Sequence, residues 1–372
     1  MRFSLILALA LAVTCASAWR ANHPFYAQQY TRVAGARGLY VDETGDLLAI
    51  STQSSSIRVI YDRANGEVAN EVLVNGSGLS LNHGISYNNG FLYASSSSTV
   101  YRWPYTPGQR TPVTAQAQTV IRGIPTGGHG TRTMVFDAQG RLYVSVGSGS
   151  NIDSNSDRAR IRRFSSLSNL PLEFTTGEVF ADGLRNEVGL GFNLDGVLYG
   201  VENGADQLNR ADLGGDIHNG NPAEEMNRFD QAPGQHYGYP YCFSTYDLRN
   251  YEGGTQFAWP TFMNDGVHTD AFCKNVANNR PPALAMPAHT APLGIDFFAG
   301  QNCDAPLTGA FPCSMIGDAA VAFHGSWNSD NKVGYKVALV PFNKATKEPT
   351  GELIDVIFEE NLSSCSSCFR PV

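Results

Sequence analysis

The stretch "GGHGTRTMVFDAQGRLYVSVGSG", residues 127–149, contains the unit that decides the fold. After His129 and a polar Thr-Arg pair, a short apolar segment leads into the turn residues Asp137–Gly140, and a second segment rich in Leu, Tyr and Val follows. Asp and Gly tolerate the positive φ angles of a tight turn between two strands. The stretch therefore predicts a strand–turn–strand unit, with His129 just ahead of its first strand.

The same unit recurs along the chain. It appears as "ARGLYVDETGDLLAIS" from Ala36, "NHGISYNNGFLYASS" from Asn82, "TRTMVFDAQGRLYVSVG" from Thr131, "LRNEVGLGFNLDGVLYGVE" from Leu184, "APLGIDFFAG" from Ala291 with "GDAAVAFHGS" after it, and "FRPV" from Phe369. The first four units begin roughly 50 residues apart, which is the span of a four-stranded blade and its connections. Six starts predict an all-β fold, a six-bladed β-propeller.

Two regions depart from the regular repeat. The segment from Asp212 to Pro287 contains two cysteines and few strand signals, which predicts a disulfide-pinned insertion over one face. Within it, the loops of residues 241–288 are expected to set selectivity. The sixth unit stops at Val372, so we expect a short or incomplete last blade. Either the chain is truncated there or the N-terminal segment completes that blade.

The N-terminus has the pattern of a secretory signal peptide. Arg2 precedes an apolar run from Phe3 to Val13, and small residues lead to a cleavage site after Ala18. We expect residues 1–18 to be removed and residues 19–372 to form a single secreted propeller domain with no membrane span. Without Arg2, 25 basic side chains (26 − 1) face 34 acidic ones, a formal charge of −9 (25 − 34). This balance argues against a nucleic-acid partner.

Six of the seven cysteines lie after the expected signal peptide. An even number in an oxidising compartment predicts up to three disulfides. Proximity in the sequence favours the pairs Cys242 with Cys273, Cys303 with Cys313, and Cys365 with Cys368, although other connectivities remain open.

Polar residues stand near the start of each repeat. In a propeller these positions converge at the mouth of the central channel, because the blades are arranged radially. A lone histidine is more often an ordinary loop residue, but matching positions in several repeats favour a shared site. The residues expected at the mouth are Arg37, His83, His129, Arg132, Arg185, Asn186, His289 and Arg370.

Several motifs carry a family resemblance: "HGTRTMVFDAQGRLYVSVGSGSNID", "GLRNEVGLGF", "YGVENGAD", "AEEMN", "HYGYPYC", "PAHTAPLGIDFF" and "VAFHGSWN". Together they resemble the secreted sorbosone/glucose dehydrogenase family, whose members use pyrroloquinoline quinone (PQQ), and they are most similar to its eukaryotic pyranose dehydrogenase branch. The resemblance covers nearly the whole mature chain. It implies a six-bladed propeller with PQQ across the mouth, in agreement with the repeats.

The resemblance also implies roles for individual residues. His129 occupies the position of the catalytic base, which takes the proton of a sugar C1 hydroxyl while hydride passes to PQQ. Arg185 and Asn186 match an Arg-Asn pair at the quinone, where a guanidinium stabilises developing negative charge. Other expected cofactor contacts are Arg37, His83, Arg132, His289 and Arg370, together with His324 and Trp327 in the "HGSWN" segment.

Calcium is the second cofactor that the resemblance implies. The backbone carbonyls of Gly204 and Ala205 match the segment that holds a Ca²⁺ ion against PQQ. Glu225 and the carbonyl of Tyr237 resemble a second, structural Ca²⁺ site. We expect a small sugar as substrate and an external electron acceptor that the sequence does not identify.

Two other functions remain open. A Ca²⁺-dependent lactonase or esterase propeller would use side-chain Glu, Asn and Asp ligands at several strand starts, whereas this chain has His and Arg there. A non-catalytic binding propeller would have lost the base and the arginine, and both are present.

Overall fold

The computed structural model describes the chain apart from residues 1–18, 24, 156, 231–232, 304–310 and 367. The expected signal peptide therefore lies outside the described residues. Strands dominate the described part, which confirms the all-β prediction. Helical structure there is confined to α1 (Asp270–Lys274) and the short 3-10 helices η1 (Phe174–Thr176), η2 (Ala211–Leu213) and η3 (Cys313–Met315).

Five sheets of four or five strands form the blades, numbered here in chain order. Blade 1 contains β2 (Ala36–Val41), β3 (Leu47–Ser51), β4 (Ser56–Asp62) and β5 (Val68–Asn75). Blade 2 contains β6 (Ile85–Asn88), β7 (Phe91–Ser95), β8 (Val100–Pro104), β9 (Gln118–Arg122) and β13 (Leu172–Glu173). Blade 3 contains β10 (Met134–Phe136), β11 (Leu142–Val146), β12 (Arg160–Phe164), β14 (Glu178–Asp182) and β20 (Gln235–His236).

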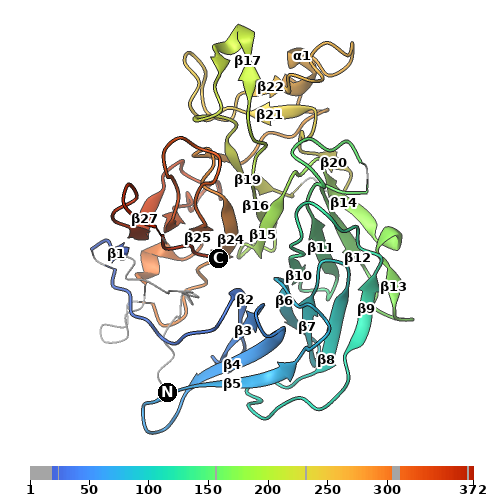
Figure 1. The fold of residues 1–372 in the computed structure, drawn as a ribbon, viewed down its shortest axis with the longest axis vertical. Coiled ribbons are helices and arrows are strands. Elements are labelled where there is room, and N and C mark those ends of the chain that lie inside the picture. The colour runs from blue at the N-terminus through green and yellow to red at the C-terminus, as the bar shows by residue number, and fades with distance from the viewer. Residues whose placement is uncertain (1–18, 24, 156, 231–232, 304–310, 367) are drawn as a thin grey trace.

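The last two blades follow the same order. Blade 4 contains β15 (Glu187–Phe192), β16 (Leu198–Glu202), β19 (Glu224–Arg228) and β23 (Leu284–Met286). Blade 5 contains β24 (Pro292–Phe297), β25 (Ala319–Phe323), β26 (Lys336–Val340), β27 (Ile354–Glu359) and β1 (Trp19–Ala21). The five sheets surround a common centre, with β2, β6, β10, β15 and β24 innermost (Figure 1).

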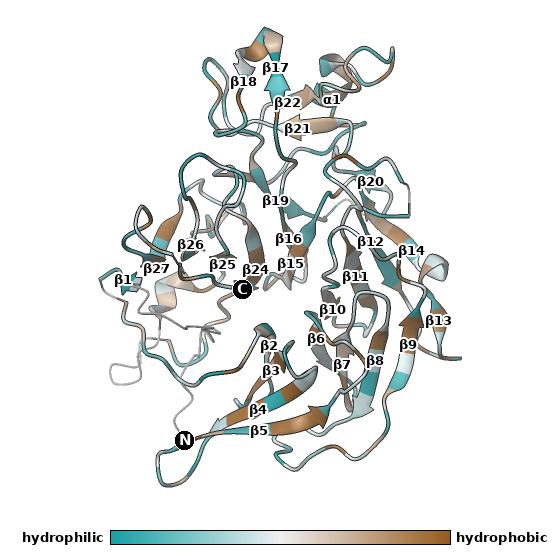
Figure 2. Ribbon diagram, in the orientation of Figure 1, coloured by the Kyte–Doolittle hydropathy of each residue, from teal (hydrophilic) through white to brown (hydrophobic). Residues whose placement is uncertain are grey.

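The core lies between neighbouring blades. Leu48 and Ile57 of blade 1 pack with Leu92 and Trp103 of blade 2 in one buried cluster. Equivalent clusters join blades 2 and 3, 3 and 4, and 4 and 5. The hydrophobic residues, brown in the ribbon of Figure 2, are accordingly concentrated in the strands. Burial of these faces stabilises each blade against the next and keeps the polar strand starts at the centre.

Close contacts between innermost strands set the geometry of the centre. A Cβ atom on Gly38 would lie 1.8 Å from the carbonyl oxygen of His83, and one on Gly84 would lie 2.2 Å from that of Arg132. In blades 4 and 5, a Cβ on Gly189 would lie 3.0 Å from the backbone of Gly294. Only glycine allows backbones to approach so closely. The residues that precede these glycines are therefore held in a ring.

The predicted count of six blades is not matched in the described part of the chain. The sixth repeat, residues 369–372, contains no strand there, although a Cβ on Gly294 would lie 3.3 Å from the carbonyl carbon of Val372. This end of the chain lies near the centre (Figure 1). The N-terminal strand β1 pairs with β27 and so extends blade 5, rather than completing a sixth blade.

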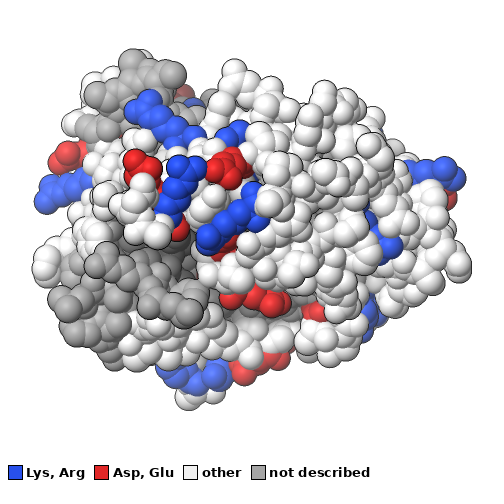
Figure 3. All heavy atoms as spheres, turned by 90° about the horizontal axis from the view of Figure 1, so that it is seen from below, with Lys and Arg blue, Asp and Glu red and all other residues white. Residues whose placement is uncertain are grey.

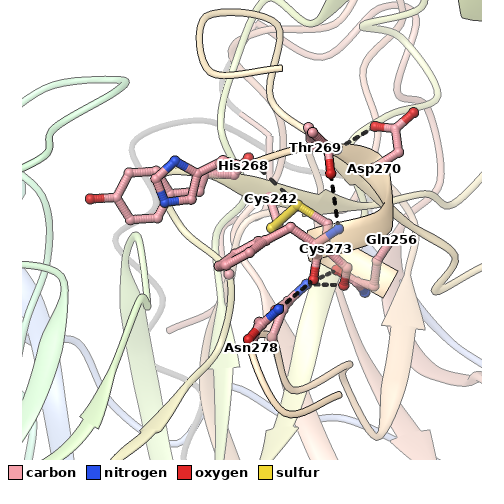
Figure 4. Close-up of a disulfide and its surroundings, with 12 residues drawn as sticks. Cys242, Gln256, His268, Thr269, Asp270, Cys273 and Asn278 are labelled. Atoms are coloured by element: carbon pink, nitrogen blue, oxygen red, sulfur yellow. Dashed lines mark hydrogen bonds between the residues drawn. A yellow bond between two sulfur atoms is a disulfide. The ribbon is translucent and has the colours of Figure 1, made fainter. Parts of the chain in front are cut away.

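The disulfide-pinned insertion is confirmed. Strands β21 (Cys242–Ser244) and β22 (Gln256–Ala258) and helix α1 lie between β19 and β23 in the chain and project beyond blade 4, near the hairpin of β17 (Asn209–Arg210) and β18 (Gly215–Asp216) (Figure 1). Cys242 and Cys273 join the first strand to α1, with Cα atoms 5.6 Å apart (Figure 4). The Thr269 side chain caps the helix by accepting the Phe272 N–H.

The two other disulfides also form the predicted pairs. The Cα atoms are 4.9 Å apart in Cys303–Cys313 and 5.2 Å apart in Cys365–Cys368. No helix in the part of the chain that the structure describes is long and apolar enough to span a membrane. On the face shown in Figure 3, basic and acidic side chains are interspersed.

We predict that Gly38→Ala destabilises the fold by about 1–3 kcal/mol, because the added methyl group overlaps the His83 carbonyl. Gly253→Ala is the matched control, since its Cβ would meet the nearest atom at an ordinary 3.6 Å. The measurement is the free energy of unfolding in denaturant. Equal stability of the two variants would contradict the proposed close contact.

Candidate active site at the mouth of the ring

His129 lies on the loop that leads into β10 and is held by Ser148 at the end of β11. Its backbone N–H donates to the Ser148 carbonyl at 3.0 Å, and its ring Nδ1 lies 3.1 Å from both the carbonyl oxygen and Oγ of Ser148. A carbonyl oxygen only accepts, so Nδ1 carries the proton. Nε2 is then the unprotonated nitrogen, the form that a general base requires.

Gly147 brings His129 beside Asn186. A Cβ atom on Gly147 would lie 2.6 Å from Asn186 Oδ1 and 2.7 Å from His129 Cβ. The backbone N–H of Ser148 also donates to the Arg185 carbonyl at 2.7 Å. The structure therefore places His129, Arg185 and Asn186 together, as the sequence predicted.

Burial keeps His129 neutral. Burial and, to a smaller extent, the positive charge of Arg185 lower the pKa of the imidazole, the Ser148 hydrogen bond opposes them, and the resulting pKa is about 4. The ordinary pKa of a histidine side chain is near 6.5. The structure shifts the protonation step to lower pH, so the base form is present across the neutral range.

Arg185 is almost fully buried and all three guanidinium nitrogens donate hydrogen bonds. Nη2 donates to Asp206 Oδ2 at 2.7 Å and Asn151 Oδ1 at 3.0 Å, and Nη1 donates to the Gly204 carbonyl at 2.5 Å. Asp206 also accepts from Asn328 at 3.2 Å. These bonds fix the guanidinium beside His129 and balance much of its charge.

Arg37 has no hydrogen-bond or acidic partner among the residues that the structure describes. It is half-buried, burial lowers its pKa, and its charge in turn lowers the pKa values of His83 and His324. His83 is 6% exposed and its Nδ1 is buried without a partner in the described chain. An unpaired guanidinium beside an unpartnered ring nitrogen fits a site that binds an anion.

Arg132 is placed differently from the cofactor contact that the sequence predicted. It is 0% exposed, and its guanidinium donates to the carbonyls of Pro125, His129 and Thr131. Burial lowers its pKa to about 10. The side chain thus shapes the His129 loop from behind.

Four more residues were predicted to contact the cofactor: His289, His324, Arg370 and Trp327. His289 is buried, with Nε2 2.5 Å from the His218 carbonyl and Nδ1 3.8 Å from Asp206. His324 Nδ1 donates to the Pro371 carbonyl at 3.0 Å. Arg370 is exposed and its guanidinium lies 4.9 Å from the centre of the Tyr335 ring. Trp327 is 77% exposed.

All four predicted metal ligands line one cavity, whose empty volume of about 360 Å³ includes space open to solvent. It is lined by Gly204, Ala205, Glu225 and Tyr237, and also by Arg185 and Glu202. No three His, Cys, Asp or Glu side chains in the described ranges are placed to hold a metal ion together. Burial raises the pKa of Glu225 to about 7 and that of Glu202 well above its usual range.

Comparison with known proteins is consistent with this geometry. Residues 14–372 match the family model described as TrAA12-like. The chain belongs to this family. It is 30% identical to the PQQ-dependent pyranose dehydrogenase of Coprinopsis cinerea. The alignment is 371 residues long and covers 90% of this chain and 48% of that protein. It is 29% identical to the PQQ-dependent sugar dehydrogenase of Hypocrea jecorina, over 92% of this chain and 80% of that one.

Solved structures of family AA12 share the fold. The PQQ domain of Coprinopsis cinerea pyranose dehydrogenase, in its holo form, matches with a TM-score of 0.82 and 28% identity, over 96% of this chain and 91% of that one. An iodide structure of the Trichoderma reesei AA12 enzyme matches with a TM-score of 0.82 and 29% identity, over 97% of this chain and 93% of that one. This TrAA12-like chain spans about half the length of the Coprinopsis cinerea pyranose dehydrogenase, 48% of it.

The sequence did not identify four residues that build the TrAA12-like site: Ser148, Asn151, Asp206 and Glu224. Glu224 is 4% exposed and accepts the Gly204 and Ala291 N–H groups. Burial raises its pKa to about 7. All four residues stand within quoted motifs, and that was the available signal: Ser148 and Asn151 in "HGTRTMVFDAQGRLYVSVGSGSNID", Asp206 in "YGVENGAD" and Glu224 in "AEEMN". Ser148 and Asn151 act on side chains distant in the sequence.

We predict that the His129 ring titrates near pH 4 and that Arg185→Gln raises this value only partly. Removing the cation relieves the smaller cause, while burial persists. The measurement is an NMR titration of the labelled ring, with Arg163→Gln in the outer part of blade 3 as control. A wild-type value near 6.5 would contradict the described burial.

Proposed function

We propose that the chain is a secreted quinoprotein that oxidises the C1 hydroxyl of an aldose or pyranose with PQQ as cofactor. The observation that carries the proposal is a neutral histidine with an unprotonated Nε2, beside a fixed arginine at the mouth of the ring. The names of the Coprinopsis and Hypocrea relatives support the cofactor and the substrate class. Three disulfides support secretion.

His129 acts as the general base in this proposal. Its Nε2 takes the proton of the C1 hydroxyl, and the Nδ1–H bond to Ser148 keeps the ring in the required tautomer. Bound PQQ supplies the two-electron acceptor for the hydride that leaves C1. Proton and hydride together account for the two hydrogens that convert the hemiacetal carbon into a lactone carbonyl.

Arg37 and Arg185 have different roles in the proposed binding of PQQ. PQQ carries three carboxylates, and Arg37 offers a charge with no partner in the described residues. Arg185 donates all its N–H groups within the described chain, so it contributes a positive charge that Asp206 fixes close to His129 rather than free donors. Asn186, His83, His289, His324, Trp327 and Arg370 are the further cofactor contacts that we propose.

Calcium fits the cavity beside Arg185. The Gly204 carbonyl has a second lone pair besides the one bound by Arg185, and the Ala205 carbonyl is the adjacent donor that we propose. For a structural ion, Glu225 and the Tyr237 carbonyl line the same cavity, and Glu187 nearby has a buried carboxylate oxygen with no partner in the described chain. A cation there would stabilise carboxylates whose charged forms burial disfavours.

A sixth blade completes the proposed architecture. Phe369 is 3% exposed, and Val372 lies beside Gly294 as His83 lies beside Gly38. These contacts support a new innermost strand that begins next to β24. In this arrangement Arg370 lies at the strand start, like Arg37 in blade 1.

The lactonase and the binding module are the alternatives. A lactonase would place carboxylates toward the bound metal at several strand starts, but the carboxylate of Asp206, whose charge acts on His129, is paired with Arg185. A non-catalytic binding module does not require a histidine with a fixed tautomer, whereas a general base does. Both observations favour the dehydrogenase.

We predict that His129→Ala retains PQQ affinity but lowers kcat by about 10²- to 10⁴-fold, the usual contribution of a positioned base. The wild-type rate should stay level through neutral pH and fall as pH drops through about 4, because the imidazolium cannot accept a proton. Dye reduction with an active aldose over pH measures both. Unchanged turnover of the variant would remove His129 from the mechanism.

We predict that Arg37→Met weakens PQQ binding about tenfold or more, because a charge-assisted contact is lost. Arg32→Met, an exposed arginine nearby, is the matched control and should bind as the wild type does. Fluorescence titration of PQQ into the apoprotein measures the affinities.

We predict that PQQ binding needs both Arg185 and the metal. The wild type and Arg185→Ala are titrated with PQQ, each with and without a chelator of divalent cations. Binding should be strongest for the wild type with Ca²⁺ present. Equal affinity in all four titrations would contradict the proposed cradle.

A further inference from the structure

We propose that Glu224 is a positioning residue that clamps together two backbone segments of neighbouring blades at the mouth, and this inference rests on the proposed function. Its Oε2 accepts the Gly204 N–H at 2.7 Å and its Oε1 accepts the Ala291 N–H at 3.1 Å. One carboxylate at the start of β19 thus joins the end of β16 to the start of β24.

The first segment carries the groups that hold Arg185. The Gly204 carbonyl accepts from the arginine, and Asp206 pairs with it two residues later. Gly204 is also packed tightly, because a Cβ there would lie 2.7 Å from the Ala223 carbonyl oxygen. A shift of the Gly204 N–H away from Glu224 would therefore move the partners of Arg185.

The second segment is held in an unfavourable backbone conformation. His289 and Ala291 have φ angles of 59° and 51°, in the left-handed region that non-glycine residues rarely adopt. The Glu224 bond to the Ala291 N–H stabilises this turn. The Ala291 carbonyl in turn accepts the His324 N–H at 2.8 Å, so the clamp extends to a second residue of the mouth.

A carboxylate suits this position better than an amide. Two N–H donors approach two different oxygens, and a glutamine side chain offers only one oxygen. The hydrogen bonds that the Glu224 carboxylate accepts in the described chain are these two backbone bonds. The charge of Arg185 also lies close enough to act on the carboxylate. The residue therefore holds the backbone of the mouth directly.

The test uses Glu224→Gln, with Asp137→Asn as matched control. Asp137 is another shielded carboxylate that accepts two backbone N–H groups, those of Gln139 and Arg141, in the β10–β11 turn. We expect Glu224→Gln to speed hydrogen exchange in residues 203–206 and 288–292 and to weaken PQQ binding, each by about tenfold or more. The control should change neither quantity.

The two readouts separate the clamp from the proposed function. Exchange is measured on the apoprotein, so it tests Glu224 even if the wild type does not bind PQQ, a result that would overturn only the proposed function. Unchanged exchange in both segments, or unchanged PQQ affinity in a variant derived from a PQQ-binding wild type, would overturn the clamp. If Glu224→Gln does not fold, Glu224→Asp is measured in the same way, with the same expected direction.

Discussion

The contact between innermost strands is the constraint on which the site depends. At Gly38 and Gly84 the backbone approaches the carbonyl of the next blade more closely than any side chain would allow. The backbone just before each following strand is therefore fixed at the centre, as the carbonyls of His83 and Arg132 show. Apolar packing between the blades holds the strands in this arrangement, so residues far apart in the sequence form one mouth.

Burial then determines the chemistry of that mouth. His129 is neutral because its surroundings disfavour the imidazolium, and Ser148 selects the tautomer. Arg185 is held beside it by Asp206, whereas Arg37 is left without a partner in the described chain. A base that stays unprotonated and a free guanidinium are the features that a hydride-transfer site with an anionic cofactor requires.

The repeated strand–turn–strand pattern was sufficient to predict the all-β ring and the insertion, because hairpins are specified by local alternation and turn residues. Proximity in the sequence favoured the three cysteine pairs that the structure contains, although it left other connectivities open. The role of Arg132 was not predictable, since whether a guanidinium faces the mouth or the loop behind it depends on carbonyls placed by the fold. The Glu224 contacts could not be predicted for the same reason, because its two partners, Gly204 and Ala291, lie in loops next to strands of different blades. The prediction of a sixth blade depended on only four residues, 369–372, which form no strand in the described part of the chain.

The central claim is that the mouth removes hydrogen from C1 of a sugar with His129 as base. The most direct test is a single-turnover measurement on protein loaded with PQQ and Ca²⁺, comparing an active aldose that carries deuterium at C1 with one that carries it at C2. The account predicts slower cofactor reduction with the C1 label alone. A rate that is insensitive to deuterium at C1, or no reduction by any aldose, would contradict it.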